Sequence, residues 1–236
     1  MPSVLYRKYR AQNFDQLIGQ NHITKLLKNA IKTSQIAQAY LFVGSRGTGK
    51  TSTARILAKA VNCTNPTKDG NPCNGCSVCK AITNGSMMDL IEIDAASNRG
   101  IDDIRTLRDG VRVLPFDSKY KIYIIDEVHM LSKDAWGALL KTLEEPSAHV
   151  IFILATTEKD RLPETIISRC QNFNFRKPHE NDVRELLVRV AKLEAVELDK
   201  ASYSLIALLA EGSYRDALTI LDKVLGASKD KRILVR

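Results

Sequence analysis

The sequence predicts an α/β protein with a doubly wound, five-stranded parallel sheet, followed by a small helical domain. Up to residue 177, short apolar runs alternate with helical patterns, and a glycine-rich loop follows the first of these runs. Beyond residue 177 the pattern is helical only. Continuous apolar runs are typical of buried parallel strands. Their alternation with helices predicts the crossover connections of a parallel sheet.

The length and hydrophobic content indicate how large a core the chain can form, and the net charge indicates the kind of partner that it suits. The chain has 236 residues, 44% hydrophobic and 26% charged, enough for one large domain or two small ones. Its net charge of +8 suits a polyanionic partner, although some soluble proteins are basic without one. No apolar run approaches the roughly 18 residues needed to cross a bilayer. Arg7, Lys8 and Arg10 precede no apolar segment, so we expect a cytoplasmic protein without a secretory signal.

The first twenty residues are polar and aromatic, and too irregular to be a helix or strand by periodicity. One interpretation is an ordered arm that packs onto the domain. The other is a lid over the base of a nucleotide, with Tyr9 and Arg10 near the adenine. The residues alone do not decide between them. Helical spacing of apolar residues begins after Asn21 and reaches Ile31.

The glycine-rich loop predicts a phosphate site. It lies between the apolar run 39–43 and a helical pattern at 52–62, which is the context that a phosphate-binding loop requires. Its glycines let successive N–H groups point at one anion, and the helix N-terminus adds partial positive charge. Lys50 is expected to reach the β- and γ-phosphates, and the Thr51 hydroxyl to bind Mg²⁺. The predicted nucleotide-binding residues are Gly44, Ser45, Arg46, Gly47, Thr48, Gly49, Lys50, Thr51 and Ser52.

A cysteine cluster follows the helix after this loop. Its members are Cys63, Cys73, Cys76 and Cys79, with turn-forming residues between the first two. Four thiolates at this spacing suit a tetrahedral zinc ion, although an iron–sulfur cluster uses the same ligands. The zinc is expected to be structural, and the alternative role of the insertion is a docking surface. Two disulfides fit poorly beside a cytosolic nucleotide site. The distant Cys170 is expected to be an ordinary thiol.

Two carboxylates end a predicted strand. The apolar run 121–125 leads to Asp126 and Glu127, and ligands bind at the carboxyl ends of strands in open α/β sheets. We therefore expect Asp126 to hold Mg²⁺ opposite Thr51, and Glu127 to take a proton from the attacking water. The other runs that we expect to form this sheet are 89–94, 150–155 and 171–175, and a helix through Val113 follows the first of them.

Three further predictions concern a helix cap, a histidine and a pair of threonines in the part of the chain before residue 178. Ser132 is a plausible N-cap for a helix at 133–145, and His129 is expected to be a packed turn residue. A hydroxyl of the pair Thr156-Thr157 would face the γ-phosphate and orient the hydrolytic water, but strand-capping threonines explain the pair equally well.

The helical part spans three amphipathic patterns, at 179–193, 198–210 and 214–225, with a domain boundary near residue 178. Arg215 falls in the first turn of the last helix, against the preference of the helix dipole. It is either a solvated side chain or one that meets a phosphate across a cleft. Residues 226–236 are polar and basic, and we expect a linker there.

Together these motifs resemble the AAA+ ATPases of the clamp-loader branch. The residues that carry the resemblance are Gly44–Thr51, Ile122–Glu127 with His129-Met130-Leu131, Ala155-Thr156-Thr157, Ser168-Arg169-Cys170 and Gly212–Ala217. The four-cysteine insertion narrows the resemblance to the gamma/tau subunits of bacterial DNA polymerase III. It extends from about Tyr6 to Leu225, nearly the whole chain.

The resemblance implies ATP and Mg²⁺ as cofactors, with Zn²⁺ in the insertion. The implied roles are Lys50 and Thr51 in Walker A, Asp126 and Glu127 in Walker B, Thr157 as first sensor, Arg215 as second sensor and Arg169 as an arginine finger acting in trans. Residues 1–177 would form the AAA+ domain with a zinc module at 63–79. Residues 178–225 would form the lid, and 226–236 a linker or the start of a further domain.

The implied activity is ATP hydrolysis within the DNA polymerase III holoenzyme. ATP-bound subunits would hold the sliding clamp open around primer–template DNA, and hydrolysis would release the clamp. The implied partners are other clamp-loader subunits, the clamp and the DNA backbone. Arg99 and Arg105 are our candidates for phosphate contacts, which position DNA without reading its sequence, although each also suits an ordinary surface charge.

Two rival functions remain to be compared with this one. The first is another AAA+ DNA motor, such as a branch-migration helicase subunit, against which the cysteine cluster and Ser168-Arg169-Cys170 argue. The second is a scaffold that binds nucleotide or clamp without turnover. The presence of Lys50, Asp126 and Glu127 argues against the scaffold, which has no need of all three.

Overall fold

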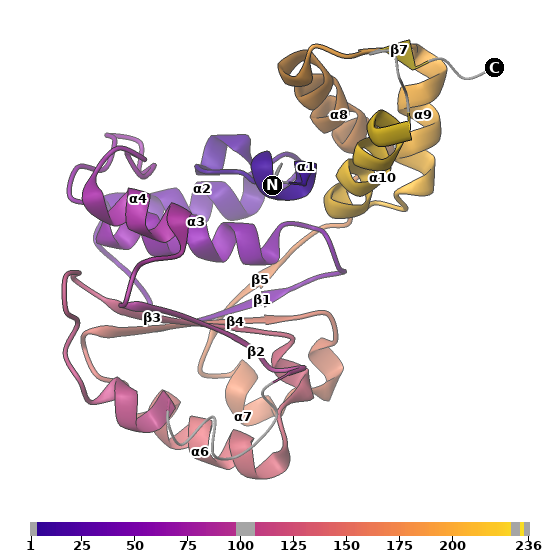
Figure 1. Cartoon of the computed structure of the whole chain (residues 1–236). Helices are drawn as coiled ribbons and strands as arrows, with labels where there is room; N and C mark the ends of the chain where they lie inside the picture. The colour runs from indigo at the N-terminus through magenta and orange to yellow at the C-terminus, as the bar shows by residue number, and fades with distance from the viewer. Residues whose placement is uncertain (1–3, 98–106, 228–231, 234–236) are drawn as a thin grey trace.

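The computed structural model of the chain describes residues 4–97, 107–227 and 232–233. At its centre lies a five-stranded parallel sheet with strand order β2-β3-β4-β1-β5 (Figure 1). The strands are β1 (Ala39–Val43), β2 (Leu90–Asp94), β3 (Lys121–Asp126), β4 (Val150–Thr156) and β5 (Gln171–Asn174). Each coincides with a strand predicted from the sequence, so the predicted fold class is confirmed.

Alternate residues of the strands face two separate apolar cores. Tyr40 and Phe42 of β1 pack into the core that contains α3, whereas Leu41 packs with Trp136 of α6 on the other face. Figure 1 shows α2, α3 and α4 on one side of the sheet and α6 and α7 on the other. Every residue of β4 is buried, which is why this strand is continuously apolar in sequence.

The helices around the sheet begin and end close to the predicted residues. The side chain of Ser132 accepts a hydrogen bond from the backbone N–H of Ala135 (3.2 Å), as an N-cap does. The helical segments of this part that lie wholly within the described residues are α1 (Leu5–Lys8), η1 (Phe14–Gln16), α2 (Asn21–Lys32), α3 (Lys50–Asn62), α4 (Ser77–Asn84), η2 (Val128–Met130), α6 (Lys133–Glu144), η3 (Lys159–Arg161) and α7 (Glu164–Ile167).

Periodicity does not predict five of these segments, namely α1, η1, α4, η2 and η3. The arm, expected to be irregular, contains α1 and η1, and the cysteine cluster contains α4. The helix α1 is only four residues long and is held by contacts distant in sequence. Leu5 is buried in the core of the helical bundle, and the Tyr9 hydroxyl donates to Glu194 Oε1 (2.7 Å). Short helices of this kind depend on tertiary packing, which a local pattern does not record.

The helical bundle consists of α8 (Glu180–Glu194), α9 (Lys200–Leu209) and α10 (Tyr214–Ala227), with a third apolar core between them. A second, two-stranded parallel sheet joins β6 (Glu197–Leu198) to β7 (Arg232–Ile233). The stretch expected to be a linker therefore contains the end of α10 and a strand that pairs with the bundle. Within the described ranges, no helix is both long enough and apolar enough to cross a membrane.

The bundle rests directly on the glycine-rich loop. The carbonyl of Gly47 accepts a hydrogen bond from the backbone N–H of Tyr214 (3.1 Å), and the Tyr214 hydroxyl donates to the carbonyl of Ile18 (2.9 Å). Gly47 has a φ of +78°, and a Cβ placed on it would lie 2.0 Å from Ser213 Oγ. The loop and the first turn of α10 can approach this closely only because residue 47 has no side chain.

We expect Gly47→Ala to destabilise the protein by more than about 1 kcal/mol. The new Cβ would sit on a residue with a positive φ, and it would clash with the side chain of Ser213 close to that residue's backbone. In a chain of this size, each kcal/mol lowers Tm by roughly 2–4 °C. Gly137→Ala is the matched control. Gly137 lies within α6, where a Cβ would meet no described heavy atom within 4 Å, and the change should stabilise by about 0.5–1 kcal/mol. Equal changes in Tm for the two variants would contradict the argument.

Candidate functional site

The glycine-rich loop curls around the ammonium group of Lys50. Gly47 and Gly49 have φ values of +78° and +103°, and α3 begins at Lys50 immediately after them. Lys50 is buried, and its Nζ donates to the carbonyls of Gly44 (2.7 Å) and Ser45 (3.0 Å). Burial lowers the pKa of the Lys50 ammonium, while the negative charges of Glu127 and Asp126 act in the opposite direction. The loop thus holds a buried cation beside two carboxylates.

The predicted pairing of Thr51 with Asp126 is present in the structure. Thr51 is the second residue of α3, Asp126 is the last residue of β3, and Thr51 Oγ1 donates to Asp126 Oδ2 (2.7 Å). A hydroxyl and a carboxylate beside a phosphate loop are oxygen ligands of the kind that Mg²⁺ prefers. These two residues therefore fit the magnesium site expected from the sequence.

Glu127 follows Asp126 in a left-handed conformation, with a φ of +47°. Its Oε2 accepts hydrogen bonds from Thr157 Oγ1 (3.0 Å) and from the backbone N–H of Thr157 (3.3 Å). Thr157 comes directly after β4, so the ends of two neighbouring strands meet at this carboxylate. The structure thereby links the predicted general base to the predicted first sensor.

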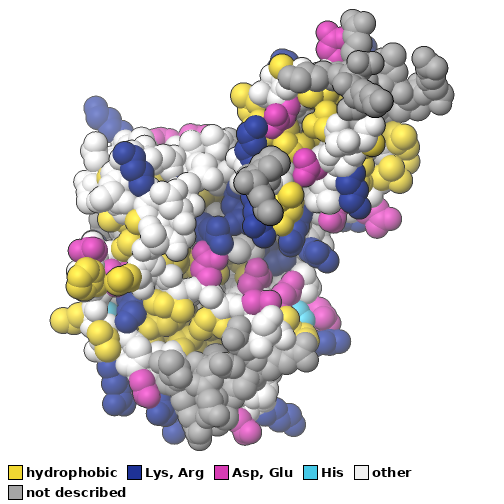
Figure 2. All heavy atoms as spheres, in the orientation of Figure 1, with side chains coloured by type: hydrophobic (Ala, Val, Ile, Leu, Met, Phe, Trp, Pro, Cys, Tyr) yellow, Lys and Arg dark blue, Asp and Glu magenta, His cyan; other side chains and the backbone are white. Residues whose placement is uncertain are grey.

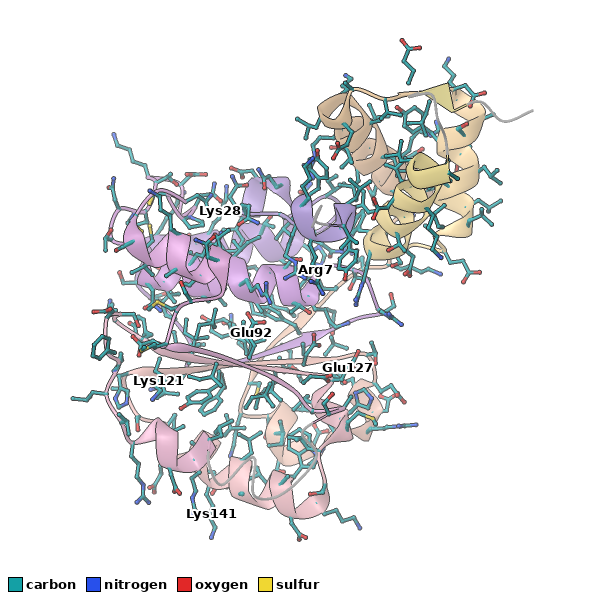
Figure 3. All side chains as sticks on the ribbon, in the orientation of Figure 1. Arg7, Lys28, Glu92, Lys121, Glu127 and Lys141 are labelled. Atoms are coloured by element: carbon teal, nitrogen blue, oxygen red, sulfur yellow. The ribbon has the colours of Figure 1, made fainter. Side chains whose placement is uncertain are left out.

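A cleft of about 700 Å³ lies between the arm, the glycine-rich loop and the bundle. It is lined by residues 46–52 of the loop and by Asp126 and Glu127. Tyr9 and Arg10, which one interpretation of the arm places near the adenine, also line it. Arg7 and Glu127, which both line the cleft, are labelled in Figure 3. Sequence reasoning missed the lining residues Tyr6, Arg7, Ala11, Gln16, Leu17, Ile18, Asp94, Ala96, Leu186, Arg189, Tyr214 and Leu218.

The charges around the cleft suit a polyphosphate. Figure 2 shows Lys and Arg side chains gathered where the helical bundle meets the rest of the protein, with Asp and Glu side chains nearby. The cations that line the cleft are Arg7, Arg10, Arg46, Lys50, Arg189 and Arg215, against the acids Asp94, Asp126 and Glu127. An excess of fixed positive charge in a partly enclosed site attracts anions.

Arg215 faces this cleft from the first turn of α10, where the helix dipole disfavours a cation. Its guanidinium lies over the ring of Tyr6, 4.9 Å from the ring centroid. Hydrogen bonds from Arg7 and then Arg215 lower the pKa of the Tyr6 hydroxyl. Of the two interpretations of Arg215, the placement favours the one that meets a phosphate across the cleft.

Four residues predicted for the nucleotide site lie outside the cleft lining, namely Gly44, Ser45, Thr157 and Arg169, and two predicted residues lie outside the described part. Gly44 and Ser45 contact Lys50 Nζ through their carbonyls. Thr157 touches the site through Glu127. Arg169 lies at the surface, where its Nη1 donates to the carbonyl of Thr165 (2.7 Å) and its Nη2 to Glu144 Oε1 (2.9 Å). Its side chain is 35% exposed rather than buried in the core. The predicted DNA contacts Arg99 and Arg105 lie outside the described residues.

The four cysteines predicted to bind zinc meet at one point. The Sγ atoms of Cys63, Cys73, Cys76 and Cys79 all lie within 4.8 Å of one another. A tetrahedral zinc ion with bonds of about 2.3 Å requires sulfur separations of about 3.8 Å. The sulfurs also accept backbone hydrogen bonds, for example Cys73 Sγ from the N–H of Cys76 (3.3 Å). The donor set and its spacing thus fit a structural zinc site.

Backbone hydrogen bonds lower the pKa of Cys73 and Cys76, whereas burial raises the pKa of Cys63 and Cys79. Burial acts to raise the pKa of Cys76, but hydrogen bonds from the backbone N–H groups of Cys79 and Thr64 lower it to about 6. A thiolate, not a thiol, is the metal ligand. For Cys170, burial raises the pKa to about 11, in agreement with the ordinary thiol expected there.

Comparison with known proteins identifies close relatives. The family described as "DNA polymerase III, delta subunit" matches residues 19–179. The chain is 53% identical over 226 residues to DNA polymerase III subunit tau of Bacillus subtilis (strain 168), covering 96% of this chain and 40% of that protein. It is 45% identical over 230 residues to subunit tau of Escherichia coli (strain K12), covering 98% and 36%. The chain thus spans about two-fifths of the length of these relatives.

Solved structures show the same fold at lower identity. The Thermotoga maritima RuvB Holliday junction branch migration motor superposes with a TM-score of 0.69 and 22% identity, over 95% of this chain and 69% of that one. At this identity the likeness concerns the fold, which is the AAA+ fold that the motifs predict.

The cysteine cluster predicts that the purified protein contains one zinc ion per chain and that Cys76→Ser loses it. Because the ligands hold a loop-rich insertion together, loss of the metal should also lower Tm, by roughly 2–4 °C for each kcal/mol lost. Elemental analysis and thermal unfolding measure both effects, and the same analysis would detect iron. Cys170→Ala, which removes a thiol outside the cluster, should keep the zinc. Equal zinc content in the two variants would refute the assignment.

Proposed function

Because the chain belongs to the DNA polymerase III subunit family and matches its gamma/tau subunits over nearly its whole length, we propose that it is an ATPase subunit of the clamp loader. It uses ATP binding and hydrolysis to load the sliding clamp onto primed DNA during replication. The observation that carries the proposal is the meeting of Lys50, Thr51, Asp126 and Glu127 at one cleft.

Each group of the site has a separate task. Lys50 and the N–H groups of residues 46–52 bind the phosphates, and Thr51 and Asp126 hold Mg²⁺. The metal ion neutralises charge on the phosphates when it is bound. Glu127 takes a proton from the attacking water, and Thr157 fixes the carboxylate by its two hydrogen bonds to Oε2. Arg215 contacts the phosphates from the bundle.

Arg169 acts on the nucleotide of a neighbouring subunit. Its position on the surface, on a segment that does not line its own cleft, supports a role in trans. The ion pair with Glu144 is half-exposed, so a partner can replace it at small cost. An arginine supplied in trans can raise the rate of phosphoryl transfer by roughly 10³–10⁵. Hydrolysis is thereby gated by subunit geometry.

An exposed apolar surface supports a protein partner such as the clamp. Leu114 and Phe116, in the loop before β3, are largely exposed, as is Met88 before β2. Asp89 accepts hydrogen bonds from the backbone N–H groups of Phe116 (2.8 Å) and Asp117 (2.9 Å), which holds the two loops together. Grouped apolar side chains on a surface are typical of protein contacts.

The rival functions have less support. The likeness to RuvB motors is one of fold, whereas the sequence identity of 53% is to a DNA polymerase III subunit. A scaffold without turnover would not require a carboxylate held in place beside a P-loop lysine.

The proposal predicts ATP turnover that clamp and primed DNA stimulate, and its loss in Lys50→Ala. The variant removes the cation that binds the β- and γ-phosphates. Steady-state ATPase measurements on the protein assembled with its partner subunits test this, with and without clamp and DNA. Lys141→Ala, at an exposed position of α6, is the control and should hydrolyse ATP normally. Turnover that survives in Lys50→Ala, or a wild-type protein that binds ATP without hydrolysing it, would refute the proposal.

Arg169→Ala should leave the Kd for ATP near normal while stimulated hydrolysis falls by at least about 10³-fold, since the missing guanidinium acts on a neighbour's nucleotide. Glu144→Gln is the matched control, because it weakens the same ion pair but keeps the arginine. Its stimulated rate should stay near that of the wild type. Equal loss of binding and of hydrolysis in Arg169→Ala would show that the arginine serves its own subunit instead.

A further inference from the structure

His129 lies two residues after the proposed general base, in η2, and its side chain is only 5% exposed. Its Nδ1 lies 3.0 Å from Thr156 Oγ1 and 3.5 Å from Glu127 Oε2. Its Nε2 lies 3.2 Å from Glu158 Oε1. The ring therefore stands between the carboxylate of the site and a second carboxylate outside it.

The contacts continue to the surface. Glu158 Oε2 accepts from Arg161 Nε (2.8 Å), and the backbone N–H of Glu158 donates to Thr156 Oγ1 (3.0 Å). The Arg161 side chain is 62% exposed. Glu158 and Arg161 belong to the segment that leads from β4 through η3 and α7 to Arg169. A continuous set of polar contacts thus joins Glu127 to the segment that carries the arginine proposed to act in trans.

We propose that His129 is a positioning residue for Glu127, and that it makes the orientation of this carboxylate depend on the Glu158–Arg161 pair at the surface. The inference rests on the proposed ATPase function and deepens it. Contacts that a neighbouring subunit makes with the exposed Arg161 reach the general base through Glu158 and the imidazole.

The hydrogen-bond pattern supports this role. Thr156 is buried, and its hydroxyl accepts from the N–H of Glu158 while it lies within hydrogen-bond distance of Nδ1. With the Thr156 hydroxyl as donor to Nδ1, Nε2–H donates to Glu158, and the plane of the ring is fixed at both nitrogens. In this tautomer Nδ1 has no proton to donate to Glu127 Oε2, which lies 3.5 Å away, so the fixed ring limits the rotation of the carboxylate by contact on one side. Thr157 holds the carboxylate by hydrogen bonds on the other side.

Two substitutions test the role of the ring. His129→Asn keeps a polar group near the Nδ1 position but does not reach Glu158, and Glu158→Gln keeps an acceptor but removes the charge. We expect His129→Asn to lower kcat for stimulated hydrolysis by about tenfold or more, but by less than the loss of about 10²–10⁴ expected when a general base itself is removed, with KM and Kd for ATP nearly unchanged. Glu158→Gln should lower kcat in the same way and to a smaller extent.

The double variant distinguishes a positioning role that acts through Glu158 from independent effects of the two substitutions. If His129 acts through Glu158, adding Glu158→Gln to His129→Asn should lower kcat no further, whereas independent effects multiply. His149→Asn is the matched control, since His149 contacts the carbonyl of Val111 away from the cleft. Thermal unfolding verifies that each variant is folded. If His129→Asn does not fold, the kcat of Glu158→Gln alone tests the proposal.

The outcomes distinguish this inference from the function on which it rests. Absence of turnover in the wild-type assembly would overturn the proposed ATPase. Normal wild-type turnover, together with an unchanged kcat in folded His129→Asn or Glu158→Gln, would overturn only the role of His129. A raised KM with an unchanged kcat, or multiplicative losses in the double variant, would do the same.

Discussion

The register of the three central strands determines where the groups of the nucleotide site lie. Val43 of β1 pairs with Thr156 of β4, and Ile125 of β3 pairs with Leu154. The carboxyl ends of these strands therefore reach one edge of the sheet together, and Gly44, Asp126 and Thr157 follow at that edge. A slip of one residue would exchange the two faces of a strand and bury its side chains in the wrong core. Because both faces are apolar cores, the register depends on the fit of individual side chains in each core rather than on an alternation of apolar and polar residues.

The cleft is completed by segments from opposite ends of the chain. The arm and the bundle pack on each other through Leu5, Tyr9 and Glu194, and the bundle rests on the glycine-rich loop at Gly47. A group on the bundle, such as Arg215, thereby lies across from Lys50 without any strand between them. The loop and α10 are joined directly by the backbone hydrogen bond from the N–H of Tyr214 to the carbonyl of Gly47.

Local sequence patterns and the expected positions of the strand ends predict part of this site. The five strands and the pairing of Thr51 with Asp126 follow from apolar runs and from the rule that parallel strands end at one edge. The short helix α1 was missed because its stability comes from distant contacts, and the contacts of His129 depend on distances that no spacing records. Tyr9 both packs on the bundle and lines the cleft, so its position agrees with either interpretation of the arm and does not decide between them.

One helix joins the two candidate sites. Lys50 and Thr51 lie at the start of α3, while the buried Lys59 lies near its end and binds Gln12 Oε1 of the arm and Asn74 Oδ1 of the insertion (3.1 Å). Asn71 of the insertion also accepts a hydrogen bond from the backbone N–H of Phe14 (2.9 Å). The arm residues beyond Arg10 are therefore held by the cysteine insertion, whereas those before it are held by the bundle. The wall of the cleft formed by Tyr9 and Arg10 lies between these two anchors, so its position depends on both.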